Sequence, residues 1–170
     1  MTDKKPATKQ KKTLQVLVHG KCGGRLKKII TDAAEFYLSI MMPRHDYEKL
    51  TLQIYMRNRR GMKGDEGTCM VIDTNYRNIP TEFELEINRD NNTKTILYNL
   101  AHEMVHVKQF ATKELNEGQS RWLGKYYDDE KIDYWDLPWE IDAYGRERGL
   151  YIRYIQKYKL DSIDEEFLFV

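Results

Sequence analysis

The sequence has few cysteines and no long apolar segment, and both absences narrow the class of protein. Its two cysteines, Cys22 and Cys69, form no CxxC pair and are too few for a disulfide framework. No apolar run approaches the roughly 20 residues of a membrane-spanning helix. The lysine-rich residues 1–12 also lack the apolar core of a secretory signal. We therefore expect a reduced, cytoplasmic protein with no membrane partner.

An excess of charge of one sign is also missing. The 28 lysines and arginines balance 27 acidic residues, so no overall field draws the chain toward nucleic acid. Residues 1–12, which we expect to be a disordered basic arm, and the arginines at 57–60 are the segments that could contact phosphates. Charged tails and loops are usually just solvated, so nucleic acid is a minor alternative as a partner.

Apolar periodicity predicts one α+β domain over residues 13–160, between the basic arm and an acidic, then apolar, tail at 161–170. Alternation predicts strands, whereas apolar residues three and four apart predict helices. The predicted elements are a strand at 14–18, a helix at 25–42, strands at 50–56, 68–73 and 83–87, a helix at 93–114 and a helix at 138–158. Residues 115–137 are rich in Trp, Tyr and Asp and predict irregular structure that overhangs a cleft.

The predicted helix at 93–114 carries His102-Glu103-Met104-Val105-His106, an HExxH motif. Residues four apart lie one turn above each other, so His102 and His106 can hold one metal ion. Glu103 lies beside them, within reach of a metal-bound water. The other explanation is a buried helix whose two histidines have ordinary hydrogen-bond partners.

A catalytic zinc ion usually has three protein ligands, so a third is needed. The only other histidines, His19 and His45, lie upstream of the motif, which leaves one of them or a carboxylate. Glu140 is the best carboxylate, because it lies in the first turn of the last predicted helix, and Ala143 one turn later would permit close helix packing. Asp142 is its rival on another face of that helix. Glu140 could also be simply an acid favoured near a helix N-terminus.

These motifs resemble the gluzincin branch of the zincin metallopeptidases, in which HExxH is followed by a helix that carries a glutamate ligand. The order of elements is similar to that of the minigluzincins and of SprT-like domains. The segment Asp-Leu-Pro-Trp-Glu-Ile-Asp-Ala-Tyr-Gly-Arg-Glu is similar to one in small metallopeptidase-like proteins of tailed bacteriophages. The resemblance implies a zincin-like α+β fold, a small mixed sheet of three to four strands, and one zinc ion held by His102, His106 and Glu140.

Two departures from these families are visible. The chain has no third histidine after the motif and no zinc ribbon, both of which are usual in SprT-like proteins. It also lacks the Asn-Glu-x-x-Ser-Asp form of the larger gluzincins. The sequence therefore does not identify the residue that orients a zinc-bound histidine.

The implied function is a zinc metallopeptidase that cleaves a peptide or protein substrate, with Glu103 as general base toward a metal-bound water. The alternative is a zinc-containing binding or assembly protein with little hydrolytic activity. An oxyanion-stabilising residue is also needed, and the sequence does not choose among its candidates. These candidates are Tyr126, Tyr127, Tyr134, Tyr144 and Arg146.

Substrate binding in this architecture resembles the addition of a strand to a sheet edge. One hypothesis is that residues 83–87 form that edge beside the cleft. Glu82, Glu84 and Glu86 would then favour basic peptides. The plainer explanation for these three glutamates is a solvated face of a strand.

Overall fold

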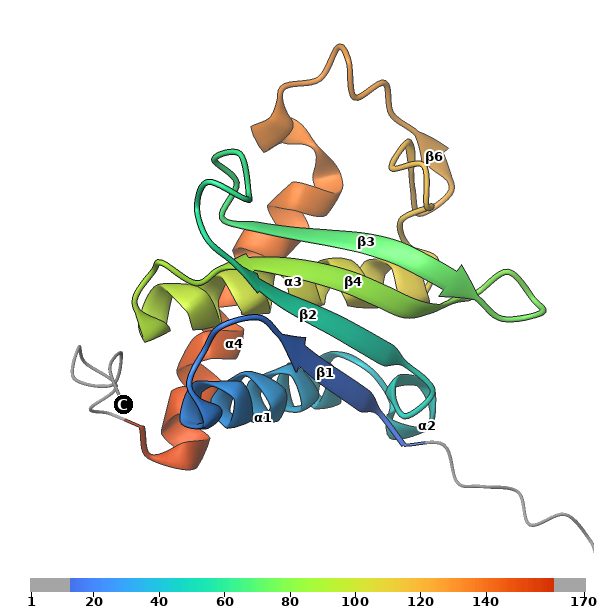
Figure 1. The fold of residues 1–170 in the computed structure, drawn as a ribbon. Helices are drawn as coiled ribbons and strands as arrows, with labels where there is room; N and C mark the ends of the chain where they lie inside the picture. Colours follow the sequence, from blue (N-terminus) through green and yellow to red (C-terminus); the bar gives the residue numbers. More distant parts are fainter. Residues whose placement is uncertain (1–12, 161–170) are drawn as a thin grey trace, which may run out of the picture.

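A mixed four-stranded sheet with helices on one face forms the body of the protein (Figure 1). The computed structural model describes residues 13–160, so the predicted basic arm at 1–12 and the tail at 161–170 lie outside the described residues. In chain order the elements are β1 (Gln15–His19), α1 (Gly24–Met41), α2 (Arg44–Tyr47), β2 (Thr51–Arg57), β3 (Gly67–Thr74), β4 (Pro80–Asn88), α3 (Thr93–Ala111), β5 (Arg121–Trp122), β6 (Lys125–Tyr126), η1 (Tyr134–Asp136) and α4 (Pro138–Tyr158). The predicted α+β class is confirmed.

The strands are arranged in the order β1-β2-β4-β3. β1 pairs with β2 and β2 with β4 in parallel, whereas β3 pairs with β4 in antiparallel fashion. The expectation that residues 83–87 form the edge beside the cleft is therefore wrong. The turn after β3 returns the chain between β2 and β3, so that β4 is paired on both sides and β3 becomes the edge strand.

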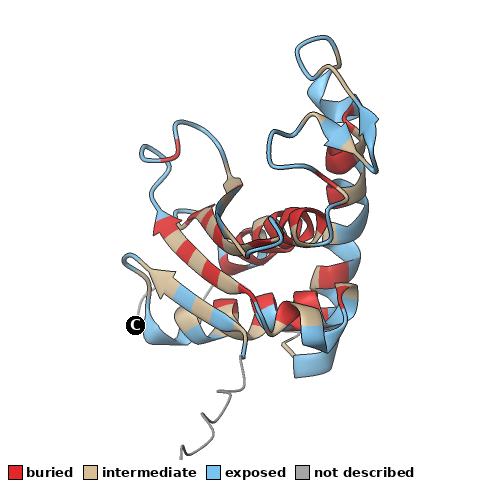
Figure 2. Cartoon of the chain, turned by 90° about the vertical axis from the view of Figure 1, so that its right-hand side faces the viewer, coloured by how far each residue is buried: buried red, intermediate tan, exposed pale blue. Residues whose placement is uncertain are grey.

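The core lies between the sheet and the helices. Alternate residues of β2 and β4 point inward and are at most 2% exposed, among them Leu52, Ile54, Phe83 and Leu85. Figure 2 shows the resulting alternation of buried and less buried positions along the strands. This period-two pattern is what a sheet with one covered face requires.

The three glutamates of β4 occupy the outward face of the sheet. Glu86 forms an ion pair with Arg57, with 2.8 Å between its Oε1 and the arginine Nε. Glu82 accepts a hydrogen bond from Gln53 at 3.1 Å. The row therefore lies on an interior strand, where Glu82 and Glu86 have partners on β2, and Glu86 also lines a hollow described below.

Helices α3 and α4 pack against each other behind the sheet (Figure 1). α3 begins after Asn92, whose side chain caps the helix by accepting from the Thr95 N–H at 2.8 Å. α4 begins at Pro138, a residue suited to the first helical position. Ala143 is fully buried at this packing, as expected for a close approach.

Residues 115–137 form a mostly irregular arch, as predicted, with only the short hairpin of β5 and β6 and the single turn η1. In Figure 1 this arch rises above β3 and leads into α4. Leu115 and Leu137, near its two ends, are buried and attach it to the core. Within residues 13–160, no helix combines the length and apolar character that crossing a membrane requires.

Candidate metal centre

Helix α3 places both motif histidines on its cleft side. His102 and His106 are each 8% exposed, and their Nε2 atoms lie 3.2 Å apart. Their four-residue spacing gives this proximity, because one helical turn separates them. Because the two nitrogen atoms are this close together and lie on the same side of the helix, both could bind one metal ion.

Glu140 completes the cluster from the first turn of α4. Its Oε2 lies 3.3 Å from Nε2 of His102, and its Oε1 lies 3.5 Å from Nε2 of His106. The three side chains are buried and offer ligand atoms within 4.8 Å of one another. In the described part of the chain, this is the one group of His, Cys, Asp and Glu side chains with such geometry.

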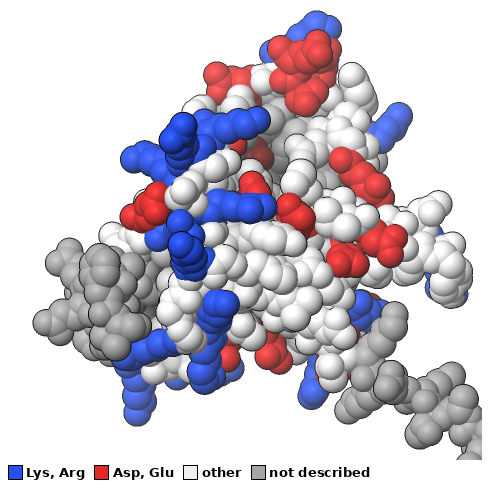
Figure 3. Space-filling model, viewed as in Figure 1, with Lys and Arg blue, Asp and Glu red and all other residues white. Residues whose placement is uncertain are grey.

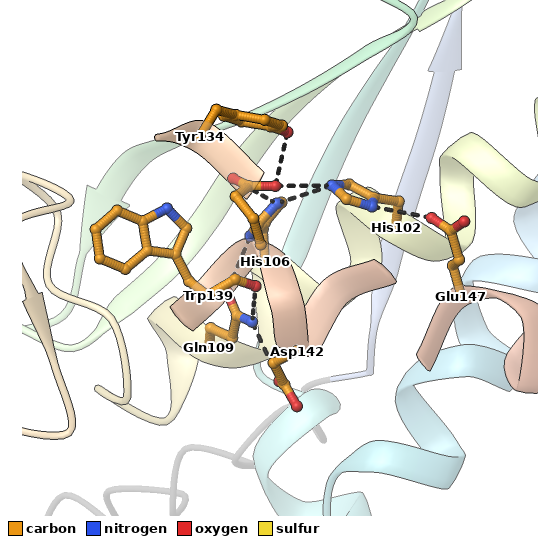
Figure 4. A network of polar contacts seen from close by, with 8 residues as sticks. His102, His106, Gln109, Tyr134, Trp139, Asp142 and Glu147 are labelled. Carbon is orange, nitrogen blue, oxygen red and sulfur yellow. Dashed lines mark hydrogen bonds and ion pairs between the residues drawn. The ribbon is translucent and has the colours of Figure 1, made fainter. Parts of the chain in front are cut away.

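The other nitrogen of each histidine has a partner of its own (Figure 4). Nδ1 of His102 lies 3.0 Å from Oε2 of Glu147, and Nδ1 of His106 lies 2.9 Å from Oε1 of Gln109. With hydrogen on Nδ1, each imidazole donates to its oxygen partner and leaves the Nε2 lone pair toward Glu140. These contacts supply the orienting partners that the sequence motifs left unidentified.

Gln109 also links α3 to α4. Its side-chain amide is fully buried and donates to the Trp139 carbonyl at 3.0 Å and to Oδ2 of Asp142 at 3.2 Å. The rival ligand Asp142 therefore binds Gln109, and through its other oxygen Arg146 at 2.6 Å, instead of joining the cluster. His19 and His45 lie elsewhere, since His19 bonds Gln53 on the sheet and His45 contacts Asp46 in α2.

The charges of the cluster are strongly coupled. Burial alone would lower the pKa of His102, but hydrogen bonds to Glu140 and Glu147 outweigh it and raise that pKa to about 9. The pKa of His106 is raised by the same balance of burial against Glu140. Burial would raise the pKa of Glu140, yet the two imidazoles hold it well below its usual range. The metal-free centre thus binds protons at the positions where a cation would be bound.

Glu103 lies beside the cluster and is 6% exposed. Burial raises the pKa of its carboxyl group to about 7, although His106 and His102 act in the opposite direction. A carboxyl group with a pKa near neutrality can both accept and return a proton, which suits it to general acid–base chemistry.

Two adjoining hollows, of about 380 and 360 Å³, open onto this cluster. Gly67, His102, Glu103 and Tyr134 line both of them. Residues 67–70 of the edge strand form one wall of the larger hollow. Acidic side chains are visible around the hollowed upper part of the face in Figure 3.

Some of the predicted oxyanion-stabilising candidates lie at the metal cluster and others lie away from it. The Tyr134 hydroxyl donates to Oε2 of Glu140 at 2.7 Å, and the Tyr144 ring centroid is 4.5 Å from that of His102. Tyr126 is 60% exposed in the hairpin, and Tyr127 packs against Trp139. The structure therefore brings Tyr134 and Tyr144 to the cluster, whereas Tyr126, Tyr127 and Arg146 line neither hollow.

Comparisons with known proteins add no relative to this picture. No protein-family model, no curated protein and no solved structure matches the chain. The function of the chain must therefore be inferred from the HExxH motif and from the geometry of the centre.

Proposed function

We propose that the chain is a zinc-dependent metallopeptidase with a zincin-like domain of the gluzincin type. The separations between the ligand atoms of the three side chains carry this proposal. Two ligand atoms about 2.1 Å from one zinc ion, at a tetrahedral angle, lie about 3.4 Å apart. Here the two Nε2 atoms are 3.2 Å apart, Nε2 of His102 is 3.3 Å from Oε2 of Glu140, and Nε2 of His106 is 3.5 Å from the other carboxylate oxygen, Oε1. The nearest ligand atoms of each pair of side chains are therefore spaced as they would be around one tetrahedral ion.

The chemistry of the donor set favours a catalytic site over a structural one. Two imidazoles and one carboxylate leave the fourth tetrahedral position open, and structural zinc sites usually fill it with a protein ligand. Here that side faces the hollows. A structural site would also have no use for the buried carboxyl group of Glu103 beside it.

Zinc bound at this centre would supply Lewis-acid activation of a substrate carbonyl and of water. Glu103 is the group placed to accept the proton of that water and to return it to the leaving amine. Tyr134 and Tyr144 are the phenols close enough to stabilise negative charge on the carbonyl oxygen. Glu147 and Gln109 hold the two imidazoles in orientation.

The edge strand supports a peptide as substrate. β3 pairs only with β4 among the described strands, so alternate backbone N–H and C=O groups on its other side have no strand partner. This side borders the larger hollow along residues 67–70. An extended peptide added to β3 would pass directly by the metal centre. β3 thus takes the role first expected of residues 83–87.

The test compares the wild-type protein with Glu103→Gln and Glu140→Ala. We expect Glu103→Gln to retain one zinc ion by metal analysis and to cleave a broad peptide library about 10²- to 10⁴-fold more slowly. Glu140→Ala should lose most of its zinc. Glu35→Gln, an exposed change on α1, is the matched control and should leave both properties unchanged.

Two outcomes would contradict the proposal. Equal cleavage by the wild type and Glu103→Gln would indicate a contaminating activity. A zinc-loaded wild type that cleaves nothing in the library would favour the binding or assembly protein instead.

A further inference from the structure

Gly67, the first residue of β3, lies directly against the side chain of Glu103. A Cβ atom added to Gly67 would lie 2.5 Å from Oε1 of Glu103, 3.0 Å from its Cγ and 3.1 Å from its Cδ. These distances are well inside the roughly 3.5 to 4.0 Å of favourable contact between non-bonded heavy atoms. The missing side chain of Gly67 is therefore what allows the carboxylate to lie against the edge strand.

Backbone conformation does not explain the glycine. Gly20, Gly64 and Gly124 have positive φ angles that favour glycine, and Gly67 is not among them. An alanine at position 67 would meet no conformational barrier of that kind. The requirement at this position is space for Glu103.

Glu103 depends on this packing because little else holds its carboxylate. Within residues 13–160, no hydrogen bond or ion pair joins the Glu103 carboxylate to another group. His102 and His106, by contrast, are each held at Nδ1 by Glu147 or Gln109. The position of the carboxylate is thus set by the surfaces on which it lies, and Gly67 forms one of them.

We propose that Gly67 is a positioning residue for Glu103. Because Gly67 has no side chain, it leaves a space in which the Glu103 carboxylate lies beside the metal centre, and we call this space the seat. This inference rests on the proposed function, in which Glu103 moves the proton. A methyl group at position 67 must either turn the carboxylate away from the strand or push β3 outward. In both cases the carboxylate and the metal centre change their relative position while the three metal ligands stay in place.

Gly67 also lines both hollows, so a substitution there could in principle obstruct the substrate. The two effects differ in kinetics. Obstruction would raise KM, whereas a displaced base would lower kcat and leave KM nearly unchanged. A misplacement of about 1 Å can reduce turnover on the order of 10²-fold.

The first experiment measures zinc content and peptide cleavage for Gly67→Ala. We expect one zinc ion per chain, a KM within about threefold of wild type, and a kcat lower by about 10- to 10³-fold. Gly149→Ala is the matched control, because a Cβ there meets nothing within 4 Å, and its kinetics should equal those of the wild type. A wild-type kcat in Gly67→Ala would overturn the proposal, and so would a loss confined to KM.

The second experiment does not need activity. It compares the Tm of the zinc-loaded wild type, Gly67→Ala, Glu103→Ala and the double variant. If Glu103 occupies the seat, Gly67→Ala lowers the Tm by several degrees in the wild type and by much less when Glu103 is already alanine. The same coupling holds if Gly67→Ala folds only together with Glu103→Ala.

If Gly67→Ala lowered the Tm equally in the presence of Glu103 and in the Glu103→Ala variant, the proposal that Gly67 positions Glu103 would be refuted. An inactive wild type would refute the proposed function, and the Tm comparison would still decide whether Gly67 holds Glu103. The failure of one proposal can therefore be told from the failure of the other.

Discussion

Zinc and protons should compete for the cluster of His102, His106 and Glu140. Hydrogen bonds with Glu140 and Glu147 raise the pKa of His102 to about 9, so at pH 7 this imidazole carries a proton in most metal-free molecules. A metal ion needs the neutral imidazole, and its binding must release that proton. We therefore predict that the apparent zinc affinity rises at least about tenfold per pH unit from pH 6.5 to 8 and levels off as the pH passes 9.

The size of the effect follows from the distance between the pKa and the working pH. Removing a proton at pH 7 from a group with a pKa near 9 costs about 3 kcal/mol, which makes zinc binding about 100-fold weaker at pH 7 than above pH 9. Because the pKa of His106 is raised as well, the number of protons released at pH 7 should be one or more.

Calorimetric titration with zinc in buffers of different ionisation enthalpy measures the released protons. Competition with a chelator at pH 6.5, 7.5 and 8.5 gives the slope of affinity against pH. Glu147→Ala removes one of the carboxylates that raise the pKa of His102, so its slope should flatten at the high-pH end. An affinity that is constant from pH 6.5 to 9, with no proton released, would refute this reasoning.

The same shift predicts a change in the stability of the metal-free protein with pH. The folded-state pKa of His102 is raised above its unfolded value of 6.5, so its stabilising contribution is complete below pH 6.5 and is lost as pH rises toward 9. Its size is on the order of 3 kcal/mol. The Tm of the metal-free protein should fall over this interval, and excess zinc should reduce the fall.

Three further substitutions test separate contacts. Glu147→Ala should lower zinc affinity by about 10- to 100-fold in chelator competition above pH 9, where protons no longer compete for His102, whereas the exposed control Glu35→Gln should not change it. Tyr134→Phe should lower kcat by about 10²- to 10³-fold with zinc retained if its hydroxyl stabilises the oxyanion, and a loss of zinc with normal kcat in the loaded protein would instead assign it to holding Glu140. Ala143→Leu should reduce the unfolding free energy by about 1 to 3 kcal/mol in urea titrations, because this fully buried residue lies where α4 packs, and an unchanged midpoint would contradict that packing.

Local patterns were sufficient to predict most of the elements but not the order of the strands. Residues 83–87 alternate between apolar and acidic side chains, and an edge strand and an interior strand of a sheet with one covered face share this alternation. Which strand lies at the edge depends on the pairing of β4 with both β2 and β3. Such long-range pairing leaves no mark on the periodicity of a single strand.

The residues of the centre also differ in whether local sequence patterns or long-range packing determine their positions. The juxtaposition of His102 and His106 is local to one helix, so their spacing alone predicted it. The approach of Glu140 depends on how α4 crosses α3, and it was suggested by the place of Glu140 in the first turn of the last predicted helix together with the family resemblance. Glu147 went unnoticed although it lies seven residues after Glu140, which is two turns along one helical face. Gln109, three residues after His106, could have been found by the same argument.

Three elements contribute residues to the centre, and substitutions in their contacts should have different effects on zinc content and turnover. α3 carries both histidines and Glu103, α4 supplies Glu140 and Glu147, and β3 bounds Glu103 through Gly67. Because zinc would bridge α3 and α4, part of its binding free energy would stabilise their packing, and changes at this contact should lower zinc content and stability together. The contact between Gly67 and Glu103 involves no metal ligand, so a change there should lower turnover while zinc remains bound. Parallel measurements of zinc content and kcat can therefore assign any variant of this cleft to one contact or the other.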